Sequence, residues 1–356
     1  MSARPPMNTR PPEVRLRAGS SSRLLLGRFV QRLDLGVALT LLVVLGMLAY
    51  VSYVAIGRGS GAELWTILRR TWWLVLLLTV PYLGARMVVW YELLCQLDIS
   101  VPTRQLMVAF AGGELTKSLP AGIYVQNYLL GRLGHLGQRS LVRSTMATTT
   151  MLGLESVLAL PTALIIGLPG TPWLSWVLLG LVGAWVAFLL LFALLVRFRQ
   201  RHIGPRAAAW RYRLVSIIGD FLAAGREFLT FRTARSLVPT AVYMLAYAAE
   251  LYLIIRAAGG SHITLHDAMG IYAVLVLATI LVPIPSEIGI TEFTGLSALL
   301  AYGLPPHIAA IIMLGFRILG SGSVILLAGA AIFLLRRELA QERDVEQMSG
   351  HLGVYR

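Results

Sequence analysis

Apolar segments long enough to cross a lipid bilayer recur along this chain of 356 residues. About 20 apolar residues in a helix cover the roughly 30 Å hydrocarbon core of a membrane. These segments are also much longer than the strands of a transmembrane barrel, which have about 10 residues of alternating hydrophobicity, so a barrel is not expected. The sequence therefore predicts an all-α polytopic membrane protein with about six full transmembrane helices. The predicted spans are residues 35–56, 72–94, 144–168, 173–196, 237–256 and 306–335.

The composition agrees with a membrane protein and excludes an ordinary soluble enzyme. Apolar residues make up 57% of the chain and charged residues only 13%, about half the share in soluble domains. Lys and Arg total 31 against 17 Asp and Glu, but the basic residues cluster between apolar spans. There they set topology and attract anionic lipid, so the expected partner is an anionic membrane surface and not a nucleic acid. A single cysteine and six scattered histidines predict no metal site and no cofactor.

The basic segments predict the orientation of the chain. Residues 1–34 form a disordered basic tail, 197–235 a basic amphipathic segment and 338–356 a polar tail. The positive-inside rule places all three in the cytoplasm, so both termini are cytoplasmic and 35–337 is the transmembrane domain. The segment 197–235 either lies on the membrane surface or packs against cytoplasmic loops. The loop 57–71 is discordant, because it carries three arginines and yet must lie outside.

Two further apolar stretches, 104–131 and 268–302, are interrupted and consist of pieces too short to span the membrane. Each predicts a re-entrant helical hairpin, which survives at membrane depth only when it is buried in protein or lines a wet cavity. The two hairpins enter from opposite sides, and with their flanking spans they form inverted repeats. Paired broken helices in inverted halves indicate a transporter site near the midplane. The breaks contain Pro120-Ala121-Gly122 and Pro285-Ser286-Glu287-Ile288-Gly289.

Ionisable residues inside apolar segments predict the site itself, because an unpaired charge in hydrocarbon costs a few kcal/mol or more. Lys117, the only lysine of the sequence, precedes the first break, and Glu287 and Glu292 flank the second. Glu92, Glu250 and Arg317 can instead lie near the membrane interfaces and be solvated. The predicted substrate-binding residues are Arg86, Glu114, Lys117, Pro120, Gly122, Gln126, Asn127, Glu287, Gly289, Glu292 and Arg317.

Several of these residues resemble the motifs of a known family, the lysylphosphatidylglycerol synthase transmembrane region, also called the flippase-like domain family. The resemblance covers residues 35–337 and implies movement of a lipid between leaflets of a bacterial inner membrane. Only a short polar tail follows Arg337, so the synthase activity of some relatives is not expected here. The similar stretches are Pro285-Ser286-Glu287-Ile288-Gly289-Ile290-Thr291-Glu292, Tyr302-Gly303-Leu304-Pro305, Phe316-Arg317, Leu119-Pro120 through Leu130, and Arg86, Trp90 and Leu93-Leu94.

The sequence thus predicts a transporter and not an enzyme, since no Walker loop, nucleotide-binding Gly-rich turn or His-Glu-x-x-His motif is found. It would bind an anionic or aminoacylated phospholipid, or a lipid-linked precursor, and move it between leaflets. A homo-oligomer or a separate synthase partner is compatible with this interpretation. One alternative is a polytopic transferase acting on a lipid-linked substrate, with Glu114 or Glu287 as acid or base. Another is a non-transporting membrane protein that recruits a partner protein through its basic tail and amphipathic segment.

Overall fold

The computed structural model describes residues 61–117, 122–167, 230–281 and 289–335, with a few further positions. These residues belong to one unit, Val43–Arg356. The predicted tails, 1–34 and 338–356, lie outside the described residues. All regular elements within the described ranges are helical: α2 (Gly61–Gln96), α3 (Thr103–Thr116), η1 (Gly122–Tyr124), α4 (Val125–Leu133), α5 (Gln138–Ile166), α8 (Phe231–Arg235), α9 (Leu237–Ala257), α10 (Leu265–Leu281), α11 (Ile290–Ala301), α12 (Pro306–Phe316) and the π-helical turn η2 (Arg317–Ser321).

Among the residues that the structure describes, four helices are long and apolar enough to cross a membrane: α2, α5, α8 with α9, and α12 continued through η2 to Leu335. This confirms the all-α polytopic fold. The predicted spans 35–56 and 173–196 lie almost wholly outside the described residues and stay a prediction. The 36 residues of α2 would measure about 54 Å, well over the hydrocarbon thickness, so this helix tilts or projects beyond it.

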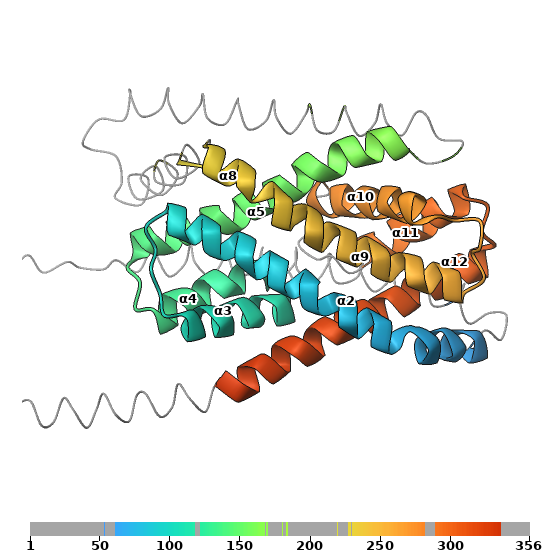
Figure 1. Ribbon diagram of the computed structural model, residues 1–356, viewed down its shortest axis with the longest axis horizontal. Helices are drawn as coiled ribbons and strands as arrows, with labels where there is room; N and C mark the ends of the chain where they lie inside the picture. Colours follow the sequence, from blue (N-terminus) through green and yellow to red (C-terminus); the bar gives the residue numbers. More distant parts are fainter. Residues whose placement is uncertain are drawn as a thin grey trace, which may run out of the picture. The chain divides into compact units, whose positions relative to one another are not determined.

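The buried face of α2 is polar as well as apolar. Trp72 and Trp73, each about half exposed, lie outside this face. Helix α9 packs along the buried face and runs in the opposite direction (Figure 1). The buried residues of α2 recur three or four positions apart, so they lie on one face of the helix, and the polar ones among them point into the interior of the bundle. The buried positions are Ile67, Thr71, Val75, Thr79, Tyr82, Arg86, Val89, Trp90, Leu93 and Leu94.

The first hairpin consists of α3, η1 and α4, and glycine makes its close packing possible. A Cβ added to Gly113 would lie 2.6 Å from Cβ of Gln126 on α4. A Cβ on Gly122 would lie only 1.6 Å from the backbone oxygen of Thr116. The Thr116 hydroxyl is itself 2.9 Å from the carbonyl oxygen of Gly122, so the end of α3 and the start of η1 are held together. The break between them, with Pro120, lies outside the described residues.

The second hairpin, α10 and α11, lies toward the opposite end of the long helices in Figure 1. Helix α10 begins with a capping box, in which Thr264 N–H donates to Asp267 Oδ2 at 2.8 Å and Asp267 N–H donates to Thr264 Oγ1 at 3.2 Å. Helix α11 begins after Gly289, whose φ of 86° is a conformation that favours glycine. Glu287, in the preceding break, lies outside the described residues.

The amphipathic segment 197–235 is described only near its C-terminal end. Phe228 is buried, and Arg143 of α5 donates to Glu227 at 2.5 Å. This end of the segment therefore contacts α5, and the choice between the two sequence interpretations of the whole segment stays a prediction. The remainder lies outside the described residues.

Candidate functional site

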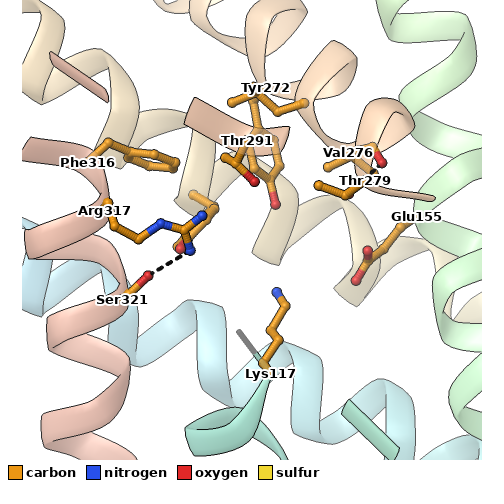
Figure 2. Close-up of a pocket in the computed structure, with 11 residues that line it drawn as sticks. Lys117, Glu155, Tyr272, Val276, Thr279, Thr291, Phe316, Arg317 and Ser321 are labelled. Carbon is orange, nitrogen blue, oxygen red and sulfur yellow. Dashed lines mark hydrogen bonds between the residues drawn. The ribbon is translucent and has the colours of Figure 1, made fainter. Parts of the chain in front are cut away.

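A cavity with about 500 Å³ of empty space, counting its open side, lies where the two hairpins approach each other. In Figure 2, Lys117 and Arg317 extend into it from two sides and Glu155 from a third. Lys117 directly follows α3, and Thr291 lies in the first turn of α11, so both hairpins contribute to one cavity. The lining residues are Lys117, Glu155, Tyr247, Tyr272, Leu275, Val276, Thr279, Thr291, Phe316, Arg317 and Ser321.

Arg317 is positioned by Glu292, one of the carboxylates predicted from the sequence. Glu292 is completely buried on α11, and its Oε1 accepts a hydrogen bond from Arg317 Nε. Its Oε2 accepts from the N–H of Gly289 at 2.5 Å, which satisfies a free donor at the start of α11. Arg317 opens the π-helical turn η2, a widening of the helix that is frequent at functional sites. Glu292 thus links Gly289, at the end of the second break, to Arg317, one of the two cations that line the cavity.

Lys117 is held in the cavity by aromatic side chains. Its ammonium donates to the hydroxyl of Tyr82 at 3.1 Å and lies 5.8 Å from the centre of the same ring. The Tyr82 ring stacks on Tyr247, with centroids 4.7 Å apart, and Tyr247 also contacts Tyr272 and Phe316. These rings stabilise a cation and keep it within the bundle.

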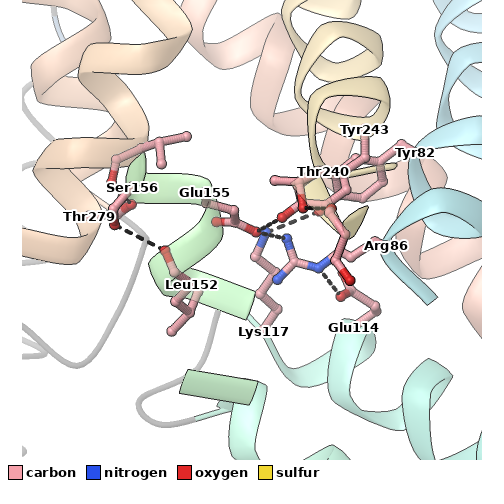
Figure 3. A network of polar contacts seen from close by, with 12 residues as sticks. Tyr82, Arg86, Glu114, Lys117, Leu152, Glu155, Ser156, Thr240, Tyr243 and Thr279 are labelled. Carbon is pink, nitrogen blue, oxygen red and sulfur yellow. Dashed lines mark hydrogen bonds and ion pairs between the residues drawn. The ribbon is translucent and has the colours of Figure 1, made fainter. Parts of the chain in front are cut away.

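Arg86 lies in a buried ion-pair network behind the cavity (Figure 3). Its Nε donates to Glu114 Oε1 and its Nη1 to Glu155 Oε1, both at 2.7 Å. Tyr243 donates to the same oxygen of Glu155 at 2.8 Å. The network joins α2, α3, α5 and α9. Arg86 and Glu114 do not line the cavity themselves, but they fix the position of Glu155, which does.

Gln126 and Asn127, also predicted as binding residues, are buried between α4 and α5. Gln126 Nε2 donates to the hydroxyl of Thr148 at 2.8 Å, and that hydroxyl is 3.0 Å from Asn127 Oδ1. Neither residue lines the cavity. Their contacts attach the first hairpin to α5, which gives them a positioning role. Gly122 and Gly289 act through the backbone, as described above.

Sequence reasoning missed the tyrosines of the site. Tyr243 and Tyr247 are four residues apart, and Glu250 follows three residues later, so all three lie on one face of α9. That spacing on an otherwise apolar helix was the available signal. The interpretation of Glu250 as a solvated residue is wrong, because the residue is completely buried. It faces α2, where Thr79 is its partner.

The family model of the lysylphosphatidylglycerol synthase TM region matches residues 35–336 of the chain. This range contains every helix described above. Comparison with curated proteins found no match, and comparison with solved structures found none either.

Proposed function

Because the chain belongs to the lysylphosphatidylglycerol synthase transmembrane family, whose members act in lipid metabolism or transport, we propose that it is a lipid transporter. It binds an anionic or aminoacylated phospholipid, or a lipid-linked precursor, and moves it between leaflets. The observation that carries the proposal is the pair of cations that face one cavity, Lys117 from the end of α3 and Arg317 from η2. The expected setting is a bacterial inner membrane, with both termini in the cytoplasm.

The chemistry of the cavity fits a phosphate group. The Arg317 guanidinium presents several N–H donors in a plane, and the Lys117 ammonium is a compact charge, so both are suited to phosphate oxygens. Hydroxyl groups of Thr279, Thr291 and Ser321 surround them. The Glu155 carboxylate, across the cavity, is placed to attract the amine of an aminoacylated head group.

A second cavity supports an amphiphilic substrate. Tyr272 lines both the polar cavity and an apolar one with about 380 Å³ of empty space. Leu245, another of its lining residues, is 45% exposed, so the apolar cavity reaches the outer surface of the helices. A head group between the cations could therefore extend an acyl chain past Tyr272 toward the bilayer. The other residues lining the apolar cavity are Leu158, Thr162, Ala241, Met244, Ala248 and Met269.

The arrangement of the helices supports movement across the membrane. The segments α2 to α5 and α9 to α12 each contain a long helix, a hairpin and another long helix, in that order. Since α2 and α9 run in opposite directions, we interpret these segments as inverted repeats. Such repeats allow a site between them to open to either side in turn. Group transfer is less favoured, because Arg86 holds the Glu114 carboxylate, which the transferase alternative uses as acid or base.

The test is a leaflet-accessibility assay with purified protein in vesicles that contain fluorescent phosphatidylglycerol or its lysyl derivative. Lys117→Gln and Arg317→Gln should each slow lipid movement by about tenfold or more, because a charge-assisted hydrogen bond contributes about 1.5–3 kcal/mol. Arg69→Gln, at an exposed position of α2, is the matched control and should move lipid at the wild-type rate. Wild-type vesicles that move these lipids no faster than protein-free vesicles would contradict the proposal.

A further inference from the structure

Glu250 differs from the other carboxylates in the interior of the bundle. It is completely buried in α9, yet no Lys, Arg or His among the described residues lies within ion-pairing distance of it. Its Oε2 is buried without a hydrogen-bond partner in the same ranges. By contrast, Glu114 and Glu155 pair with Arg86, and Glu292 pairs with Arg317. An ionised carboxylate in such an environment is strongly disfavoured, so the neutral acid is favoured.

The hydrogen bonds of Thr79 independently favour a protonated Glu250. The Thr79 hydroxyl oxygen lies 2.8 Å from the carbonyl oxygen of Val75 and 2.9 Å from Glu250 Oε1. A hydroxyl has a single hydrogen, and a carbonyl oxygen can only accept. If Thr79 donates to Val75, the hydrogen between Thr79 and Glu250 must come from Glu250. Both contacts are satisfied together only when the carboxyl group carries a proton.

Glu250 is also close to the cavity. A Cβ added to Gly320 of the π-helical turn would lie 3.2 Å from the Tyr247 hydroxyl and 3.4 Å from Glu250 Oε2. The same turn contributes Arg317 and Ser321 to the cavity, and Tyr247 lines it as well. The missing side chain at Gly320 thus lets the carboxyl group approach the wall of the cavity. The other titratable and charged groups around Tyr247 and Glu250 are Tyr82 of α2, Lys117 after α3, Tyr272 of α10 and Arg317 of η2.

We propose that Glu250 is a proton-binding site, and that its proton and an anionic head group in the cavity bind cooperatively. The cooperative part rests on the proposed function. A phosphate between Lys117 and Arg317 adds negative charge near Glu250, which disfavours the ionised carboxylate and retains the proton. By linkage, loss of that proton weakens binding of the anion by the same factor.

The proton is detected directly by infrared spectroscopy of the purified protein, without any lipid substrate. Wild-type protein should show a C=O band of a buried, protonated carboxylic acid, and Glu250→Gln should remove it. Thr79→Val, which removes only the hydrogen-bond partner, should shift the band and retain it. Glu63→Gln, at the exposed start of α2, is the matched control and should leave the band unchanged. An unchanged band in a folded Glu250→Gln protein would overturn the proposal.

Cooperativity is measured as the affinity for dihexanoyl phosphatidylglycerol, whose phosphodiester remains singly ionised throughout the titration. Wild-type affinity should fall by about tenfold, within the usual range for linked sites, as rising pH removes the proton from Glu250. The affinity of Glu250→Gln should stay near the wild-type low-pH value. Parallel pH profiles for the two proteins would overturn the cooperative part. A carboxylic acid band without lipid binding at any pH would support the proton site and contradict the proposed function.

Discussion

Replacing Arg86 by methionine tests whether the ion-pair network organises the bundle. Arg86 is 1% exposed and makes two ion pairs, to Glu114 and Glu155, that join α2 to α3 and α5. Methionine occupies a similar length without charge. The variant therefore leaves two carboxylates in the interior that no longer have their shared cation.

The magnitude follows from the burial of both partners. At an effective dielectric constant of about 20, two charges about 4 Å apart attract each other by about 4 kcal/mol. Removing one partner of a buried pair typically costs about 3–5 kcal/mol, because the other charge is left uncompensated. Glu155 retains its hydrogen bond from Tyr243, which limits the loss on that side. Arg86→Met should therefore lower the free energy of unfolding by about 4 kcal/mol, which is the typical cost of breaking one buried ion pair.

Thermal unfolding in detergent, checked by denaturant titration, measures the loss. Arg143→Met is the matched control, because its pair with Glu227 is also short but has side chains 25% and 43% exposed. It should cost about 1 kcal/mol at most. Adding Glu114→Gln to Arg86→Met removes one stranded carboxylate and should recover part of the stability. The reasoning is refuted if Arg86→Met costs no more than Arg143→Met, or if Glu114→Gln destabilises the variant as much as the wild type.

Two further substitutions test the hairpins. Gly122→Ala places a Cβ against the backbone oxygen of Thr116 and should lower the free energy of unfolding by about 2 kcal/mol or more. Gly153→Ala, with open space at a helical position, is the control and should raise that free energy by up to about 1 kcal/mol. Equal effects of the two variants in thermal unfolding would contradict the close approach of Gly122 to Thr116. Thr264→Ala should cost about 1 kcal/mol through loss of the cap of α10. Burial alone would raise the pKa of Asp267, but hydrogen bonds from Thr264 outweigh it and hold that pKa below its usual value. The stabilisation by this cap is therefore present above about pH 4 and is lost as the pH falls through the lowered pKa. The free energies of unfolding of the wild type and Thr264→Ala should therefore become equal in acid. A difference between them that does not change with pH would exclude this linkage.

The sequence predicted the helical class, the four described spans and the interior positions of Lys117, Glu292 and Arg317, because an isolated charge in an apolar segment must be compensated. Their role in binding stays a prediction. It did not predict which partner compensates each charge. Arg86 and Glu155 are 69 positions apart, and Thr79 and Glu250 are 171 apart. Such pairs depend on how helices pack, which the composition of an apolar helix does not specify.

Gln126 and Asn127 were predicted to line the cavity for the same reason: the sequence does not specify which neighbouring helix a buried polar side chain contacts. Their place after the first break predicted a cavity, whereas the structure places them against Thr148 of α5. A short helix that is buried on one side and follows a break can present polar residues to either neighbour. The π-helical turn at Arg317 was also beyond prediction, because nothing in the local residue order distinguishes it from regular helix.

The ion pairs described above have an electrical consequence. In the described interior of the bundle, Arg86, Lys117 and Arg317 supply three positive charges, and Glu114, Glu155 and Glu292 supply three negative ones. Moving one uncompensated elementary charge across the bilayer against a membrane voltage of about 100 mV requires about 2.3 kcal/mol of electrical work. An interior whose charges cancel can rearrange without electrical work. When one anion and one proton on Glu250 cross together, they transfer no net charge over a full cycle, so such a cycle would be electroneutral and driven by a pH gradient without a contribution from the membrane voltage.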